Sequence, residues 1–166
     1  MNIFSVDAET NGLYGDVWAI GAVVLSPDGK MVDSFSGQVE NPVITDQWVL
    51  TNIVPYVSLP KYKSARELRD AFWSFWMKNK ATCLAIADYA YPVESNLFRL
   101  CINDDVSRTW DGPYPLHEVA TLLYAAGIDP NISREEFSGM YHLTKHNPLD
   151  DAYLSALTWI KAKNTL

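Results

Sequence analysis

The run from Val17 to Ser26 constrains the fold more than any other stretch, because it is almost continuously apolar and rich in β-branched residues. Such a run is typical of a strand in the middle of a sheet. The turn signal Pro27-Asp28-Gly29 follows, and the segment from Lys30 to Val39 alternates in part between apolar and polar residues. Together the two segments predict a β-hairpin.

A second strand signal lies at the N-terminus and ends in two carboxylates. Ile3, Phe4 and Val6 predict a buried strand that pairs with the hairpin, giving three antiparallel neighbours. Asp7 and Glu9 follow two residues apart, so on a strand they project from one face. Burying two like charges without a partner is costly, and a hard divalent cation is their natural partner. The alternative is a strand end with two solvated acids.

The rest of the chain alternates helical signals with one further strand. We expect helices over Thr45–Ile53 with Thr45 as the cap, over Ala65–Lys78, from Pro92 onward, over His117–Ala126 and over Pro148–Lys161, a strand over Thr82–Ala87, and a loop over Asn103–Pro115. The second helix opens with the capping-box pattern Ser64-x-x-Glu67 and carries an aromatic stripe that we assign to the core. These signals predict a single α/β domain over residues 1–166, with a mixed central sheet flanked by helices.

Composition narrows the class of protein. The 166 residues are 48% hydrophobic and 20% charged, as in ordinary globular domains. No apolar run reaches the ~18 residues of a membrane span, and we find no signal peptide. Cys83 and Cys101 lie apart in apolar segments, so we expect reduced core cysteines in a cytoplasmic protein. The net charge of −7 argues against a nucleic-acid partner unless several acids bind cations.

Further polar groups stand at element boundaries, where sites in α/β sheets assemble. Asp88 ends the fourth predicted strand, and Glu94 follows on the next helix. His146 precedes the last helix, and Asp151 lies in its first turn. Taken alone, His146 is more typical of a histidine in a surface loop, and Asp151, like Asp150, of an ordinary acid at a helix N-terminus that needs no function.

Two segments of this sequence resemble motifs of the DEDDh 3′–5′ exonucleases. The first motif of that family is similar to Asp7-Ala8-Glu9-Thr10-Asn11-Gly12-Leu13, followed by Ala19-Ile20-Gly21-Ala22-Val23. The third motif is similar to His146-Asn147-Pro148-Leu149-Asp150-Asp151-Ala152, in which Asp and Ala follow the His at the family's spacing. The two matches stand near opposite ends of the chain in the family's order.

The resemblance implies an RNase H-like fold and two divalent cations, Mg²⁺ or Mn²⁺, about 4 Å apart. By position, Asp7, Glu9 and Asp151 resemble the metal ligands, and His146 resembles the general base that deprotonates the attacking water. The resemblance also assigns the terminal nucleotide to four consecutive residues: Thr10, Asn11, Gly12 and Leu13. Leu13 is expected to wedge against a base.

The middle motif departs from the family's pattern, so the fourth acid has two candidates. Glu94 matches the acidic position of the family's middle motif by its place in the helix, with Leu97 and Phe98 as the apolar pair that follows. Asp88 matches that position by residue type, because the family has an aspartate there. We favour Glu94, with Asp88 nearby as a second ligand or a hydrogen-bond partner. A further departure is Ala19, where the family often has Glu or Gln.

The expected function is a metal-dependent 3′–5′ exonuclease that releases nucleoside monophosphates from single-stranded DNA or RNA. One alternative is a catalytically weak, exonuclease-like binding module, suggested by the altered middle motif and the acidic charge. Another is a phosphohydrolase acting on free nucleotides. A homodimer is a further expectation if the core leaves some of these tryptophans exposed: Trp48, Trp73, Trp76, Trp110 and Trp159.

Overall fold

The three strands expected from the N-terminal sequence form the centre of a six-stranded mixed sheet. The computed structural model describes residues 1–166, and its sheet has the order β4-β3-β2-β1-β5-β6. The strands are β1 (Asn2–Thr10), β2 (Val17–Leu25), β3 (Met31–Val39), β4 (Lys61–Tyr62), β5 (Cys83–Ala87) and β6 (His117–Glu118). The pairs β1–β2 and β2–β3 are antiparallel, whereas β1–β5, β3–β4 and β5–β6 are parallel. The predicted α/β class with a mixed, helix-flanked sheet is confirmed.

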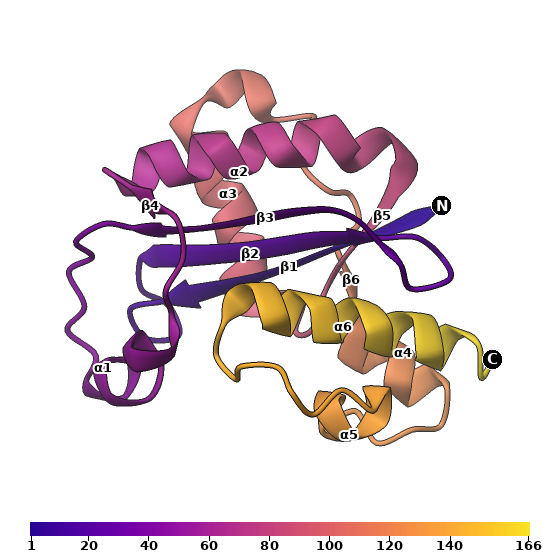
Figure 1. Ribbon diagram of the computed structural model, residues 1–166. Helices are drawn as coiled ribbons and strands as arrows, with labels where there is room; N and C mark the ends of the chain where they lie inside the picture. The colour runs from indigo at the N-terminus through magenta and orange to yellow at the C-terminus, as the bar shows by residue number, and fades with distance from the viewer.

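Helices cover both faces of this sheet (Figure 1). They are α1 (Gln47–Asn52), α2 (Ala65–Asn79), α3 (Ser95–Asp104), α4 (Val119–Ala125), α5 (Arg134–Ser138) and α6 (Pro148–Lys163). One face carries α2 and α3, and the other carries α4, α5 and α6. Every residue of β2 is buried, as its continuous apolar sequence predicts for a strand covered on both sides. None of the helices combines the length and apolar character needed to cross a bilayer.

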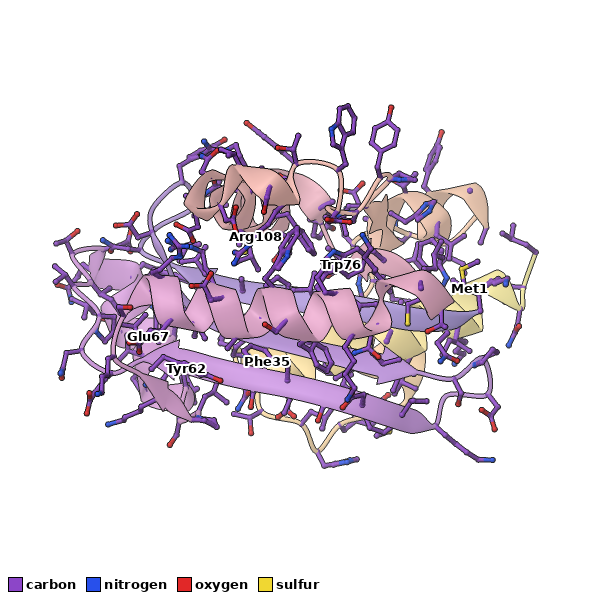
Figure 2. All side chains as sticks on the ribbon, turned by 90° about the horizontal axis from the view of Figure 1, so that it is seen from above. Met1, Phe35, Tyr62, Glu67, Trp76 and Arg108 are labelled. Atoms are coloured by element: carbon purple, nitrogen blue, oxygen red, sulfur yellow. The ribbon has the colours of Figure 1, made fainter.

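An aromatic cluster forms the core beneath α2. The Phe4 ring lies 5.0 Å from Trp76 and 5.5 Å from Phe75, centroid to centroid, in tilted and edge-on contacts that aromatic rings favour. Figure 2 looks down on α2, with Trp76 and Arg108 between this helix and the segment after α3. The Trp76 indole N–H donates to the Asp111 carbonyl at 2.7 Å. The assignment of this aromatic stripe to the core is confirmed.

Several boundaries differ from the expectations, each for a local reason. Helix α1 is capped by Asp46 rather than Thr45, because the Asp46 carboxylate accepts from the Val49 N–H at 3.0 Å. The segment at His117 starts as strand β6 because it pairs with β5 before α4 begins. In place of a regular helix from Pro92, a kinked turn spans Ala90–Glu94 before α3.

The predicted loop over Asn103–Pro115 is partly helical. Helix α3 continues to Asp104, and a short 3₁₀ turn follows over Val106–Arg108. The Arg108 guanidinium donates to the Cys101 carbonyl at 3.1 Å and pairs with Asp70 at 2.7 Å. These polar contacts order the segment, which has no apolar stripe of its own. Hydrophobic periodicity therefore did not predict its helical turns.

Candidate functional site

The candidate site lies at the end of β1, which runs beyond its neighbour β5. Pairing of β1 with β5 stops at Ser5, whereas pairing with β2 continues to Thr10. Alternate residues of β1 enter opposite cores, Ile3 toward α6 and Phe4 toward α2. Asp7 and Glu9 therefore continue the face that α6 covers, as their spacing predicts.

Gly21 brings the third acid to these two. In the β1–β2 register Gly21 lies opposite Asp7. A Cβ atom at Gly21 would lie 2.2 Å from both the Leu149 nitrogen and the Pro148 carbonyl carbon, so glycine alone lets the first turn of α6 lie directly on the sheet. Asn147 caps this turn by accepting from the Leu149 N–H at 3.1 Å. Asp151, one turn on, is held beside the β1 carboxylates.

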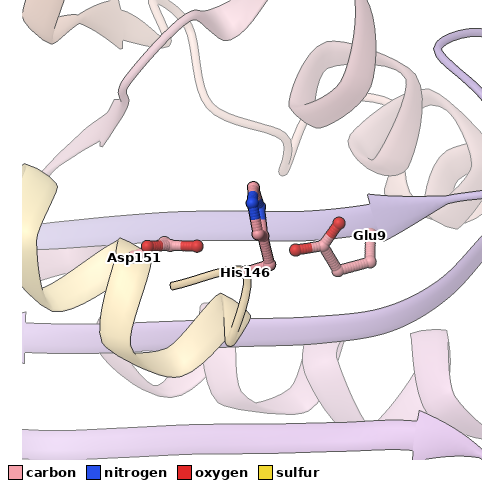
Figure 3. A group of neighbouring side chains, drawn as sticks. All are labelled: Glu9, His146 and Asp151. Atoms are coloured by element: carbon pink, nitrogen blue, oxygen red, sulfur yellow. The ribbon is translucent and has the colours of Figure 1, made fainter. Parts of the chain in front are cut away.

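His146 enters the site from the segment just before α6. Its backbone has φ of 61°, the left-handed region that a non-glycine residue seldom adopts. Ligand atoms of Glu9, His146 and Asp151 lie within 4.8 Å of one another, and Figure 3 shows the imidazole between the two carboxylates. The His146 ring also meets the Trp48 ring edge-on, with centroids 6.0 Å apart and planes at 85°. The structure thus brings together residues predicted from opposite ends of the chain.

The two candidates for the fourth acid have different surroundings. Asp88 accepts from the Arg134 guanidinium at 2.8 Å, so its charge already has a partner. Glu94 is buried, with 6% of its surface exposed, and has no cationic partner. After burial, Glu94 is the largest contribution to the raised pKa of Asp7. Glu94 as the fourth acid stays a prediction, and its surroundings favour it over Asp88.

Burial and mutual repulsion raise the pKa values of the clustered carboxyl groups. Burial, followed by the neighbouring carboxylates, holds the pKa of Asp7 well above its ordinary value. Burial and the Asp151 charge raise the pKa of Glu9 to about 8. Burial raises the pKa of Glu94 to about 8, although backbone hydrogen bonds oppose the shift. It raises the pKa of Asp151 to about 7, against the opposing hydrogen bond from the His146 backbone.

These carboxyl groups fit divalent metal ions. No lysine or arginine pairs with Asp7, Glu9, Glu94 or Asp151 in the structure, so their repulsion is uncompensated by the protein itself. Carboxylate oxygens are the ligands that Mg²⁺ and Mn²⁺ prefer, and a bound cation would reverse the unfavourable local field. His146, within reach of Glu9 and Asp151, is placed either to ligate such an ion or to act beside it.

The carboxylates open into a cavity of about 740 Å³. Its lining includes all six predicted acidic and histidine positions, Asp7, Glu9, Asp88, Glu94, His146 and Asp151. Three of the four residues predicted to hold substrate also line it: Thr10, Gly12 and Leu13. Leu13 is 59% exposed at this position. The cavity therefore joins a polar floor to an exposed apolar side chain.

Asn11 is placed differently from its neighbours. Its side-chain oxygen accepts from the Thr45 and Asp46 N–H groups, each at 2.9 Å, and its amide nitrogen donates to the Thr45 hydroxyl at 3.2 Å. These bonds attach the loop after β1 to the start of α1, the helix that carries Trp48. Direct contact of Asn11 with a substrate stays a prediction, whereas its bonds to the α1 segment are plain.

Sequence reasoning missed two residues at this site. Arg134, the partner of Asp88, lies on α5, and Ser133-x-x-Glu136 before it is a capping-box signal that was overlooked: the Ser133 hydroxyl accepts from the Glu136 N–H at 3.3 Å. Trp48 was considered only as a core or dimer residue, but it is 59% exposed beside His146. Nothing local in the sequence links it to a histidine about a hundred positions away.

Comparison with protein-family models and with curated protein sequences gave no match.

Proposed function

We propose that this chain is a metal-dependent 3′–5′ exonuclease with an RNase H-like fold, which removes nucleoside monophosphates from the 3′ ends of single-stranded DNA or RNA. The observation that carries the proposal is the half-buried group of Asp7, Glu9 and Asp151, which has no cationic partner and lines one cavity together with His146. The two motifs that contain these residues are the ones that resemble the DEDDh family.

Two divalent cations held by Asp7, Glu9, Asp151 and Glu94 would stabilise the attacking and leaving oxygens of an in-line phosphoryl displacement. His146 accepts the proton of the attacking water on an imidazole nitrogen, a task for which neutral imidazole is suited near pH 7. Trp48 contacts the ring and fixes its orientation. Thr10, Gly12 and Leu13 hold the end of the substrate, because they line the same cavity as the acids.

The acidic charge of the chain is compatible with this substrate once cations bind. Two divalent ions would offset four of the seven net negative charges, and they would do so at the point where the scissile phosphate sits. Asp88 needs no such ion, because Arg134 already pairs with it. Of the other acids only Asp46 and Asp88 line this cavity, and charges on the exposed surface are screened at physiological salt over about 8 Å.

The test of the function is cleavage of 5′-labelled single-stranded DNA and RNA oligonucleotides by the purified protein with Mg²⁺ or Mn²⁺. We expect a ladder that shortens from the 3′ end and is lost with EDTA or with a 3′-phosphate block. The variant His146→Ala should lose at least a hundredfold in turnover. The matched control is His142→Ala, which removes an exposed histidine of the same segment and should keep full activity.

Metal binding measured on the same variants separates the two roles open to His146. If His146 is the general base, its removal should leave Mn²⁺ binding nearly intact, whereas Asp7→Ala or Asp151→Ala should abolish Mn²⁺ binding. Equal loss of turnover and Mn²⁺ affinity in His146→Ala would make His146 a ligand. Absence of both cleavage and metal binding in the wild type would favour the weak binding module, and hydrolysis of free nucleotides alone would favour the phosphohydrolase.

Two further parts of the proposal concern the protein's surroundings. Cys83 and Cys101 are free thiols, which suits a reducing compartment such as the cytoplasm. Trp73, Trp76 and Trp159 are buried, whereas Trp48 is 59% and Trp110 94% exposed. Because Trp48 lies beside His146, Trp110 is the tryptophan that we assign to a homodimer contact. Sedimentation of the wild type against Trp110→Ser would show whether that ring holds two copies together.

A further inference from the structure

A second hollow adjoins the cavity that holds the acids. This side groove has a volume of about 360 Å³, and the residues that line it include Leu13, Tyr14, Tyr91, Pro92, Asn96 and Arg99. Leu13, Tyr91 and Pro92 also line the larger cavity, so the two hollows meet along these residues. A molecule longer than one nucleotide could therefore pass from the acids into the side groove without leaving the surface.

The side groove presents aromatic rings to solvent. Tyr14 and Tyr91 are each 72% exposed, and Leu13 between the two hollows is 59% exposed. Large apolar side chains that are exposed together beside a polar cavity are typical of a ligand-binding surface. Aromatic side chains bind unpaired bases by stacking on their π-faces, a contact that tolerates any base.

Arg99 supplies the groove with a positive charge that the protein does not use. The chain's other four arginines each pair with an aspartate: Arg66 with Asp70, Arg69 with Asp104, Arg108 with Asp70, and Arg134 with Asp88. Arg99 contacts only the neutral Asn96 side-chain oxygen, at 2.5 and 3.2 Å. In a chain of net charge −7, this guanidinium remains free for an anion.

We infer that the side groove binds the nucleotides that precede the terminal one, with Arg99 on a backbone phosphate and Tyr14 and Tyr91 against bases. This inference rests on the proposed function and narrows its substrate to single-stranded chains of several nucleotides. An unpaired strand fits better than a duplex, because stacking on tyrosine needs bases with a free face. A free nucleotide or a dinucleotide would fill the acidic cavity without engaging the whole groove.

Binding measured by fluorescence anisotropy tests the groove apart from catalysis. The parent protein is the His146→Ala variant, which is titrated into a labelled single-stranded octamer in Mg²⁺. Two double variants, which add Arg99→Gln or Tyr14→Ala to the parent, are titrated in the same way. We expect each added substitution to weaken octamer binding about fivefold or more. Arg99→Gln should also reduce the slope of log Kd against log salt by about 0.7, the value for one phosphate of a single strand.

The matched control is Lys163→Gln, which removes one exposed positive charge near the C-terminus, at the far end of α6 from the site (Figure 1). It should leave octamer binding unchanged. An equal loss in Lys163→Gln would attribute the effect to net charge and overturn the inference. Unchanged octamer affinity in Arg99→Gln, or no octamer binding by the parent protein, would overturn it as well.

Hydrolysis by the otherwise wild-type protein distinguishes failure of the groove from failure of the proposed function. Arg99→Gln should lower kcat/KM for the octamer about fivefold while leaving kcat/KM for a dinucleotide unchanged. Equal losses for both lengths would contradict the groove and leave the exonuclease standing. No shortening of any oligonucleotide by the wild type would reject the exonuclease itself, and the anisotropy result would then decide the groove alone.

Discussion

Trp48 contacts the His146 ring, and we expect this contact to hold the imidazole in its orientation. His146 has a left-handed backbone conformation and meets the Trp48 ring edge-on at 6.0 Å. We expect Trp48→Ala to lower kcat about tenfold without changing Mn²⁺ affinity, because an unsupported imidazole adopts productive orientations less often. Trp48→Phe, which keeps a ring edge there, should restore most of the rate.

The comparison that isolates this contact is Trp110→Ala, the removal of another exposed tryptophan. It should leave kcat unchanged. If Trp48→Ala instead raised KM with an unaltered kcat, Trp48 would contact the substrate rather than orient the base.

Neutralising Glu94 and neutralising Asp88 should have different effects on turnover and on stability. Glu94→Gln removes a buried carboxylate beside Asp7, so we expect at least a hundredfold loss of Mn²⁺-dependent turnover. Asp88→Asn removes the partner of Arg134 and should reduce turnover far less, while lowering stability through the unpaired guanidinium. Retention of the full rate by Glu94→Gln would reverse the assignment.

At the scale of elements, Gly21 sets the distance between β2 and α6. Gly21→Ala would place a methyl group 2.2 Å from the Pro148–Leu149 backbone, which must move. Overpacking of this kind costs about 1–3 kcal/mol, so we expect a clear fall in Tm. Turnover should fall further than stability alone explains, because the same shift withdraws Asp151 and His146 from Asp7.

Gly112→Ala serves as the control for this substitution. An added Cβ there would meet only the Ile102 side-chain end at 3.3 Å, which can yield. Thermal melting and turnover of both variants give the comparison. A Gly21→Ala protein with unchanged Tm and rate would show that α6 need not lie so close to the sheet.

Elements with strong periodicity or continuous apolar sequence could be predicted, and short ones could not. Strands β1 and β2 and helices α2, α3 and α6 follow from their apolar patterns, whereas β3, which is mostly exposed or half-buried, follows from the turn signal before it and its partial alternation. Strand β6 has two residues and α5 has five, too few to show a period. The turn before α3 departs from helix at Tyr91, because the following Pro92 disfavours the α conformation there, a signal that the expectation of a helix from Pro92 did not include.

The same limit applies to the site. Asp7, Glu9, His146 and Asp151 could be assembled in advance because family-like motifs place them at known spacings. The Arg134–Asp88 pair, the Trp48–His146 contact and the side groove join positions distant in the chain. Their residues carry no local pattern, so only the folded arrangement reveals them.

For the whole molecule, the clustered acids of the site predict an unusual dependence of stability on pH. Their pKa values in the folded state, about 7 for Asp151 and about 8 for Glu9 and Glu94, lie above the ordinary 3.8 and 4.5. Between those limits the folded chain binds more protons than the unfolded chain, so the free energy of unfolding falls as pH rises. In EDTA we therefore expect Tm to decrease from about pH 4.5 to pH 8.

Divalent cations should reverse this trend, since they bind the folded state with its acids ionised. Adding Mn²⁺ at pH 8 should raise Tm by several degrees, with a smaller rise at pH 5, where protons compete for the carboxylates. Thermal melting curves recorded at each pH, in EDTA and in Mn²⁺, measure the pH dependence of Tm and the rise that the metal causes. A Tm in EDTA that stays level or climbs from pH 5 to pH 8 would show that these acids are not jointly buried.

The acids of the site lie on regular secondary structure, whereas the histidine lies on an irregular segment. Asp7, Glu9 and Asp151 are fixed by a strand and by the first turn of a helix seated on glycine, whereas His146 stands on an irregular segment between α5 and α6. Under the proposed function, substitutions in that segment should therefore change turnover through His146 more than they change metal binding by Asp7, Glu9 and Asp151.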